Sequence, residues 1–155
     1  MSAIFKNPML HLRTMQPEDI ETVMQVEVRA YTHPWTKGIF RDCLRAGYCC
    51  WVMELENLII GHGVMSIAAG EAHILNLCVD PEFQGRGLGR KILQRLVYLA
   101  KEHQVQTLFL EVRCSNQIAQ TLYESEGFNE IGYRRGYYPG DDKREDALVF
   151  ARELV

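Results

Sequence analysis

The chain has 155 residues, of which 47% are hydrophobic and 24% are charged. This length is enough for one hydrophobic core and short for two domains of ordinary size, so we expect a single domain over the whole chain. The composition excludes a disordered or collagen-like protein. The formal net charge of -3 argues against a broad basic face that grips nucleic acid.

The N-terminal residues contain no sustained apolar segment, and no later run approaches the roughly 18 apolar residues that a membrane span requires. We therefore expect a cytoplasmic protein that does not bind membranes. The five cysteines are odd in number and lack C-x-x-C spacing, and the five histidines are scattered without ligand spacing. The sequence thus predicts reduced, mostly buried thiols and no metal.

The first part of the chain predicts a strand at Leu10–Arg13, preceded by an extension, residues 1–8, to which we assign no function. Pro17 and two acidic residues then open a helix whose apolar positions have helical spacing, and Trp35–Leu44 predicts a second helix. The apolar positions of the first helix are Ile20, Val23, Met24 and Val28.

Three apolar runs rich in β-branched residues follow, Cys50–Leu55, Leu58–Ile67 and His73–Val79. They are separated by plausible turns at Glu56-Asn57 and at Ala69–Glu71, which predicts an antiparallel meander.

A helix is then predicted from residue 88, because apolar residues recur every three to four positions. These residues are Leu88, Ile92, Leu93, Leu96, Val97 and Ala100. The remaining expected elements are a strand at Thr107–Arg113, a helix over 116–126 ended by Gly127, a strand at Phe128–Arg134, a loop over 135–146, and a strand at Ala147–Glu153. The order predicts an α/β fold with a single mixed central sheet flanked by helices.

The stretch DPEFQGRGLGRK at residues 80–91 places three glycines at alternate positions before that helix. It matches neither a Walker loop nor a dinucleotide fingerprint, because Arg90 stands where a glycine is needed. Glycines let backbone N–H groups approach a ligand, and a helix N-terminus offers unpaired donors with partial positive charge. A pyrophosphate would suit this loop, and the alternative is a flexible turn with basic residues facing water.

The segment NLCVDPEFQGRGLGRKIL resembles the acetyl-CoA loop of the GCN5-related N-acetyltransferase (GNAT) superfamily, whose Q/R-x-x-G-x-G/A pattern is matched by Gln84, Gly87 and Gly89. The resemblance implies acetyl-CoA as co-substrate in a cleft between central strands. A bulged strand would expose backbone groups to the pantetheine arm, and the loop amides would bind the pyrophosphate. The implied cofactor-binding residues are Leu77, Val79, Gln84, Gly85, Arg86, Gly87, Leu88 and Gly89.

A closer resemblance lies in LEVRCSNQIAQTLYESEGF, in RRGYYP and in HPWT at residues 33–36, which are similar to the RimI-type ribosomal-protein-alanine N-acetyltransferases. These enzymes modify a protein α-amino group. The resemblance implies that Glu111 is the general base, directly or through water. It also implies that Tyr123 is the general acid for the CoA thiolate and that Asn116 and Tyr123 contact the cofactor.

The chemistry of these residues agrees with such roles. Strand alternation puts Glu111 on the face opposite its apolar neighbours, where partial burial is expected to raise its pKa. Tyr123 follows Asn116 by two helical turns, so both side chains point to one face, and a phenol carries a proton at pH 7. The alternatives are an exposed strand carboxylate and a core aromatic.

Two aromatic groups are candidates for substrate binding. Tyr31, Pro34 and Trp35 lie in the connection between the first two helices and could shape a peptide groove, although a Trp beside a Pro is also a common packing anchor. Tyr137 and Tyr138 lie in the loop before the last strand, which helps to place the peptide in the resembled enzymes. Half-exposed hairpin aromatics are the alternative for this pair.

Three functions remain open at this point: N-terminal acetylation of a protein, acetylation of a lysine or small amine, and non-catalytic acyl-CoA binding. The presence of both a candidate base and a candidate acid disfavours the last. The expected partner is a ribosomal protein N-terminus or similar basic peptide, drawn by an acidic excess in residues 141–146. We expect a monomer or weak dimer without direct nucleic-acid binding.

Overall fold

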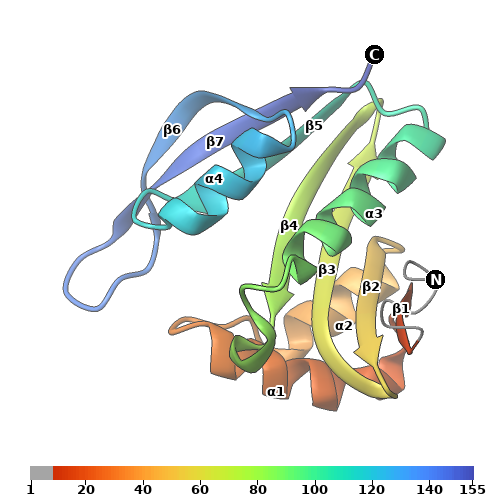
Figure 1. Cartoon of the computed structure of the whole chain (residues 1–155). Helices are drawn as coiled ribbons and strands as arrows, with labels where there is room; N and C mark the ends of the chain where they lie inside the picture. Colours follow the sequence, from red (N-terminus) through yellow and green to blue (C-terminus); the bar gives the residue numbers. More distant parts are fainter. Residues whose placement is uncertain (1–8) are drawn as a thin grey trace. The chain divides into compact units, whose positions relative to one another are not determined.

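The computed structural model describes residues 9–155, so the extension over residues 1–8 lies outside the described part. Figure 1 shows the path of the chain. The elements are β1 (Leu10–Thr14), the 3-10 turn η2 (Pro17–Asp19), α1 (Ile20–Ala30), α2 (Lys37–Arg45), β2 (Cys49–Leu55), β3 (Leu58–Ala68), β4 (Glu71–Val79), the 3-10 turn η3 (Pro81–Phe83), α3 (Leu88–Glu102), β5 (Thr107–Arg113), α4 (Gln117–Ser125), β6 (Asn129–Tyr138) and β7 (Glu145–Glu153). No helix within residues 9–155 is long and apolar enough to cross a membrane.

The described strands form a seven-stranded sheet with the order β1-β2-β3-β4-β5-β7-β6. Strand β4 pairs with β5 in parallel, with Glu71–Ile74 opposite Thr107–Leu110. The pairs β1·β2, β2·β3, β5·β7 and β6·β7 are antiparallel. The α/β class and the mixed sheet expected from the sequence are therefore confirmed.

Both predicted turns of the meander are two-residue connections with left-handed backbone. The φ angles are 52° and 68° at Glu56 and Asn57, and 54° and 81° at Ala69 and Gly70. Two consecutive residues with positive φ match the twist of paired strands, which is why this turn type joins hairpins. The first turn lies at the predicted position, whereas the second is one residue shorter than expected, because β4 begins at Glu71 rather than at His73.

The described residues cluster into two compact units, which we treat separately. Among the described residues, unit 1 comprises residues 9–65 together with Asn76–Leu96, and unit 2 comprises Ser66–Leu75 together with Val97–Val155. The single-domain organisation expected from the length stays a prediction.

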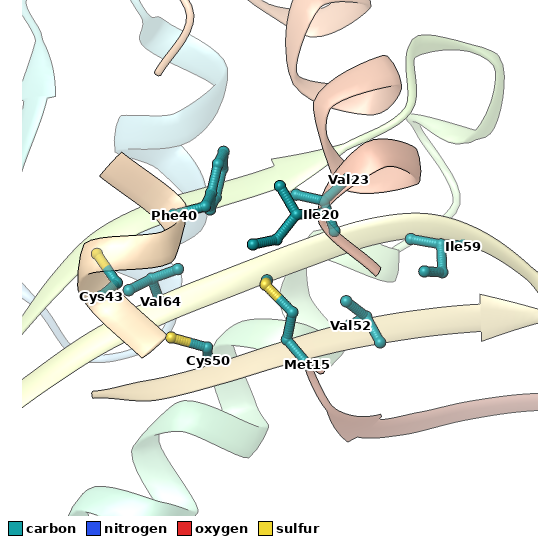
Figure 2. Close-up of a cluster of buried hydrophobic side chains, with 9 residues drawn as sticks. All are labelled: Met15, Ile20, Val23, Phe40, Cys43, Cys50, Val52, Ile59 and Val64. Carbon is teal, nitrogen blue, oxygen red and sulfur yellow. The ribbon is translucent and has the colours of Figure 1, made fainter. Parts of the chain in front are cut away.

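Unit 1 contains an apolar core between helices α1 and α2 and strands β2 and β3 (Figure 2). Helix α1 contributes Ile20 and Val23, and α2 contributes Phe40. The expected apolar stripe of α1 is wrong at one position, because Val28 is 52% exposed. The polar Glu27 is buried in its place, which a count of apolar spacing does not detect.

The other side of β3 packs closely against α3 through two glycines. A Cβ atom at Gly61 would lie 2.9 Å from the carbonyl oxygen of Cys78, and one at Gly63 would lie 2.9 Å from Cγ2 of Ile92. Such distances leave no room for a side chain. These glycines therefore bring the start of α3 against the sheet, directly after the glycine-rich loop.

Unit 2 packs α4 over strands β5 and β7 (Figure 1), with the rings of Tyr123 and Phe150 6.3 Å apart. One expectation is wrong here. Strand β6 continues to Tyr138 and β7 begins at Glu145, so the loop over 135–146 is shorter than expected. Arg144 explains the extension, because its guanidinium donates to the carbonyl oxygens of Gly136 and Tyr137 across the hairpin.

Candidate active site

The glycine-rich loop begins with Gln84, whose Nε2 donates to the carbonyl oxygen of Val79 at 3.0 Å. Gly85 and Gly87 have φ angles of 80° and 76°, and no atom lies within 4 Å of a Cβ built at either position. Helix α3 starts at Leu88, and the first N–H groups of a helix have no partner within the helix. The loop thus has the open, donor-rich geometry that the sequence predicted for an anion.

The side chains of the loop differ in exposure. Gln84, Gly85, Arg86 and Gly87 are exposed, Gly89 is half-buried, and Leu88 is only 6% exposed. The guanidinium of Arg86 lies 5.2 Å from the ring centre of Phe83. Leu88 is therefore a core residue that can offer a ligand only its backbone.

Asp80 fixes the turn before the glycine-rich loop through three contacts, which the sequence analysis did not predict. Its Oδ1 accepts from the backbone N–H of Glu82 at 3.0 Å, its own N–H donates to Ile60 at 2.8 Å, and its carboxylate pairs with Arg29. Burial raises the pKa of Asp80, but the Arg29 and Glu82 hydrogen bonds outweigh it and the net pKa is lowered. An Asp-Pro pair before a helical turn is the signal that indicates such a cap.

The C-terminal half of β4 directs its backbone groups to two different edges. The carbonyl of Cys78 faces Gly61 of β3, whereas those of Leu77 and Val79 accept from Tyr31 Oη at 2.6 Å and from Gln84. Alternate residues of a strand present their backbone groups to opposite edges. Leu77 and Val79 therefore face away from β3, as their predicted cofactor role requires.

The connection between α1 and α2 is fixed at several points. Trp35 donates its backbone N–H to Glu27 at 3.0 Å, and its ring packs on Phe40 with centroids 5.1 Å apart. Thr36 caps α2 through Ile39 N–H at 3.2 Å, so this helix begins at Lys37 rather than at Trp35 as expected. Tyr31 is exposed, whereas Pro34 and Trp35 are half-buried.

A buried polar cluster lies beneath this connection, and sequence spacing did not reveal it. His62 Nε2 lies 2.8 Å from Glu27 Oε1, and Asn76 Nδ2 donates to both carboxylate oxygens at 3.2 and 3.3 Å. Glu27, His62 and Cys78 also bring potential metal ligand atoms within 4.8 Å of one another. With the Trp35 N–H, protein donors contact both oxygens of Glu27. The carboxylate is therefore satisfied, whereas His62 Nδ1 and Asn76 Oδ1 are buried without a hydrogen-bond partner among the described residues.

In unit 2, Glu111 projects from β5 on the face opposite the buried Leu110 and Val112, as alternation predicted. His73 Nε2 lies 2.6 Å from its Oε1, and Arg134 Nε donates to its Oε2 at 3.3 Å. Burial raises the pKa of Glu111, but His73 and Arg134 outweigh it and the net pKa is lowered. The expectation of a raised pKa is therefore wrong, because these two partners were not visible in the sequence.

Tyr123 is buried in α4, with its ring 5.9 Å from Phe128. Burial raises its pKa to about 12, so the phenol keeps its proton at neutral pH. Asn116 is exposed and caps the helix, since its Oδ1 accepts from Ala119 N–H at 3.1 Å. Gln120, which the sequence analysis did not consider, fastens the preceding turn by donating to Arg113 and Cys114 carbonyls, both at 3.1 Å.

Tyr137 and Tyr138 lie on strand β6 rather than in a loop. Their rings meet edge to face with centroids 5.0 Å apart. The guanidinium of Arg134 lies 5.6 Å from the ring centre of Tyr137, and that of Arg113 lies 4.6 Å from the ring centre of Tyr138. Burial is the main cause that raises the pKa of both phenols. The pair forms an ordered aromatic surface next to Glu111.

All five cysteines are free, as predicted. Cys43, Cys50 and Cys78 are buried, Cys49 is half-buried, and Cys114 is exposed. Partial desolvation and the nearby Glu145 carboxylate, 3.6 Å from the sulfur, raise the pKa of the Cys114 thiol. Its thiolate form is therefore disfavoured near neutral pH.

In unit 1, a glycine loop at a helix start with an open strand edge beside it has the features of a site for a CoA thioester. Unit 2 carries a carboxylate, Glu111, and a protonated phenol, Tyr123, the groups with which an acyltransferase moves protons. The chain belongs to the Acetyltransferase (GNAT) family, whose profile matches residues 20–128. It is thus an N-acetyltransferase, as the sequence predicted.

Similar proteins within this family carry more specific names. The chain is 36% identical, over 90% of its length and 95% of the relative, to the [ribosomal protein bS18]-alanine N-acetyltransferase of Escherichia coli K12. It is 37% identical to that of Haemophilus ducreyi, over 92% of this chain and 99% of the relative. The crystal structure of the E. coli enzyme superposes with a TM-score of 0.89, at 35% identity and 94% coverage of both chains.

A more distant structure shares the fold. The NatC complex bound to Gag peptide and CoA superposes with a TM-score of 0.83 at 17% identity, covering 94% of this chain and 99% of that chain. At this identity the likeness shows the fold alone.

Proposed function

We propose that this protein transfers the acetyl group of acetyl-CoA to the N-terminal amine of a ribosomal protein that begins with alanine, or of a similar basic peptide. The observation that carries the proposal is the 36% identity to a bS18-alanine N-acetyltransferase over 90% of the chain. It acts as a cytoplasmic single-domain enzyme, monomeric or weakly dimeric, without nucleic-acid or membrane binding.

Backbone groups of unit 1 bind the cofactor. The first-turn N–H groups of α3 and the amides of Gly85 and Gly87 receive the pyrophosphate, since donors and helix dipole both favour an anion there. The outward edge at Leu77 and Val79 pairs with the amides of the pantetheine arm, in the way that an extended ligand adds to a strand. No metal takes part in either contact.

Unit 2 supplies the proton chemistry. Tyr123 protonates the departing CoA thiolate, a role that suits a phenol whose pKa is about 12 and which is therefore protonated at physiological pH. Transfer to the amine is direct. A covalent acetyl-cysteine is disfavoured, because the acidic neighbours of Cys114 raise its pKa and weaken it as a nucleophile.

The chemistry of the acceptor favours a chain terminus. At pH 7.4 an α-amine with a pKa near 7.8 is roughly a quarter neutral, whereas a lysine near 10.4 is only about 0.1% neutral. A terminus is thus much easier to deprotonate. We assign acceptor contacts to Tyr31, Pro34, Trp35, Tyr137 and Tyr138, and a cofactor contact to Asn116.

Two of the acidic residues in the segment 141–146, Glu145 and Asp146, have structural contacts that the sequence did not indicate. Glu145 pairs with Arg113 at 2.9 Å, and Asp146 accepts from Gly136 N–H at 2.8 Å, so both carboxylates serve the fold. We assign the attraction of a basic peptide to Asp141 and Asp142.

Purified protein should acetylate an alanine-initiated, arginine-rich peptide at its α-amine, faster at low than at high salt. Asp141→Lys with Asp142→Lys should raise KM for this peptide. Mass spectrometry would locate the acetyl group, and N-terminal peptides from cells with and without the protein would identify the substrate. More efficient acetylation of internal lysines or polyamines would establish the alternative acceptor class, and acetyl-CoA binding without turnover would establish a binding module.

A further inference from the structure

His73 and Glu111 form a close pair although they are 38 positions apart in the chain. The parallel ladder sets His73 of β4 opposite Phe109 of β5, and Glu111 follows two residues later on the same face. The His73 side chain is 31% exposed, whereas that of Glu111 is 6% exposed. The imidazole is therefore the member of the pair that a solvent molecule or an amine can reach.

The surroundings of this pair keep the carboxylate anionic. Arg134 from β6 contacts the second oxygen of Glu111, and Tyr137 and Tyr138 follow on the same strand. Although burial opposes ionisation, the net pKa of Glu111 is lowered. A carboxylate with a lowered pKa is a poor proton acceptor from an amine, but it is a good partner for a cation.

We propose that His73 is the general base of the reaction and that Glu111 is its positioning residue. Since Nε2 of His73 faces the carboxylate, Nδ1 is the nitrogen that accepts the proton from the amine. Imidazole exchanges protons in the physiological range, and a carboxylate on its far nitrogen fixes the tautomer and stabilises the imidazolium, as in hydrolase triads. The proposal rests on the proposed function, and it makes His73 the base in place of Glu111, which the sequence resemblance implied.

The proton and bond changes balance with the groups at hand. The amine nitrogen forms a bond to the acetyl carbon and gives one proton to His73 Nδ1. The bond from the acetyl carbon to sulfur then breaks, and the thiolate takes a proton from Tyr123. Exchange with solvent returns a proton to Tyr123 and removes one from His73.

The first test replaces the imidazole. His73→Gln, which keeps an N–H donor for Glu111, should lower kcat for the alanine peptide by roughly 10²-fold, with acetyl-CoA affinity unchanged. Added imidazole should restore activity to His73→Ala. The exposed His103, which contacts the Leu99 carbonyl, provides a matched control, and His103→Ala should keep the wild-type kcat. A His73→Gln enzyme with more than half of the wild-type kcat, or a His73→Ala enzyme that imidazole does not accelerate, overturns the proposal.

The second test needs no acceptor and so separates this proposal from the proposed function. The ring-nitrogen NMR shifts of His73 should show the tautomer with the proton on Nε2 in the wild type, and Glu111→Ala should remove this preference, because the acceptor that fixes the tautomer is gone. An unchanged tautomer in Glu111→Ala overturns the pairing. If the pairing holds and no α-amine is acetylated, the acceptor assignment is wrong instead.

Discussion

The two units each contain a glutamate that pairs with a histidine, and the pairs differ in their contact with solvent. In unit 1 the side chains of Glu27 and His62 are 1% and 0% exposed, and the Trp35 N–H and Asn76 complete the carboxylate shell. In unit 2 Glu111 is nearly buried, whereas its partners His73 and Arg134 are 31% and 55% exposed. The same chemical pair thus serves folding where it is enclosed and is available for proton transfer where its imidazole reaches solvent.

The largest effect is expected on stability, from the enclosed pair. Glu27→Ala would leave His62, Asn76 and the Trp35 N–H buried without their acceptor and should lower the free energy of unfolding by roughly 3–5 kcal/mol. Glu111→Ala should cost only about 1 kcal/mol, because solvent can hydrate its partners. Urea denaturation of both variants measures the difference, and equal losses would remove the distinction between the pairs.

The next largest effect is expected on kcat, from Tyr123 of unit 2. Tyr123→Phe removes the proton donor but keeps the ring among Phe128 and Phe150, so kcat should fall by roughly 10²-fold while the thermal midpoint changes little. Steady-state kinetics and thermal unfolding of the same sample test this. Phe128→Leu serves as the control for packing: it should destabilise the unit and spare kcat at low temperature. An unchanged kcat in Tyr123→Phe would refute the role of the phenol.

A substitution in the glycine-rich loop should weaken acetyl-CoA binding without disturbing either Glu–His pair. Gly87→Glu places a side chain at a φ of 76° and a negative charge beside the expected pyrophosphate. Acetyl-CoA affinity should fall at least roughly tenfold, which corresponds to about 1.4 kcal/mol. Calorimetric titration measures it, with Gly47→Glu, also at positive φ but outside the loop, as the control. Undiminished affinity in Gly87→Glu would contradict the loop assignment.

The smallest effect is expected from the ion pair between Glu145 and Arg113, in which both partners are partly exposed to solvent. Hydrogen bonds from Ser115 and Arg113 lower the pKa of Glu145 to about 2, against about 4.3 for a free glutamate. A lowered folded-state pKa adds stability above the unfolded value, and this is lost as pH falls from about 4 to about 2. Glu145→Gln should remove that part of the acid sensitivity, worth within about 1 kcal/mol for a partly exposed pair. Thermal midpoints measured from pH 5 to pH 2 that fall in parallel would show that Glu145 contributes nothing.

The sequence predicted the local features of this protein. The turns at Glu56-Asn57 and Ala69-Gly70, the start of α3 after the glycine loop and the alternation around Glu111 all depend on residues close in the chain, so propensity and spacing suffice to predict them. The resemblance in residues 76–93 and 110–128 predicted the family. The errors have causes that local spacing does not contain: the end of β6 depends on Arg144 from across the hairpin, and the exposure of Val28 depends on which face of α1 packs into the core.

Only the tertiary structure decided which ionisable groups meet. Scattered histidines gave no ligand spacing, yet strand register brings His73 to Glu111, and helix packing brings Glu27 to His62 and to Asn76, 49 positions away. Spacing reveals side chains that share one helix or strand, whereas these contacts join different elements. The pKa of Glu111 followed the same rule: burial alone predicted an increase, and two partners from other strands reversed its direction.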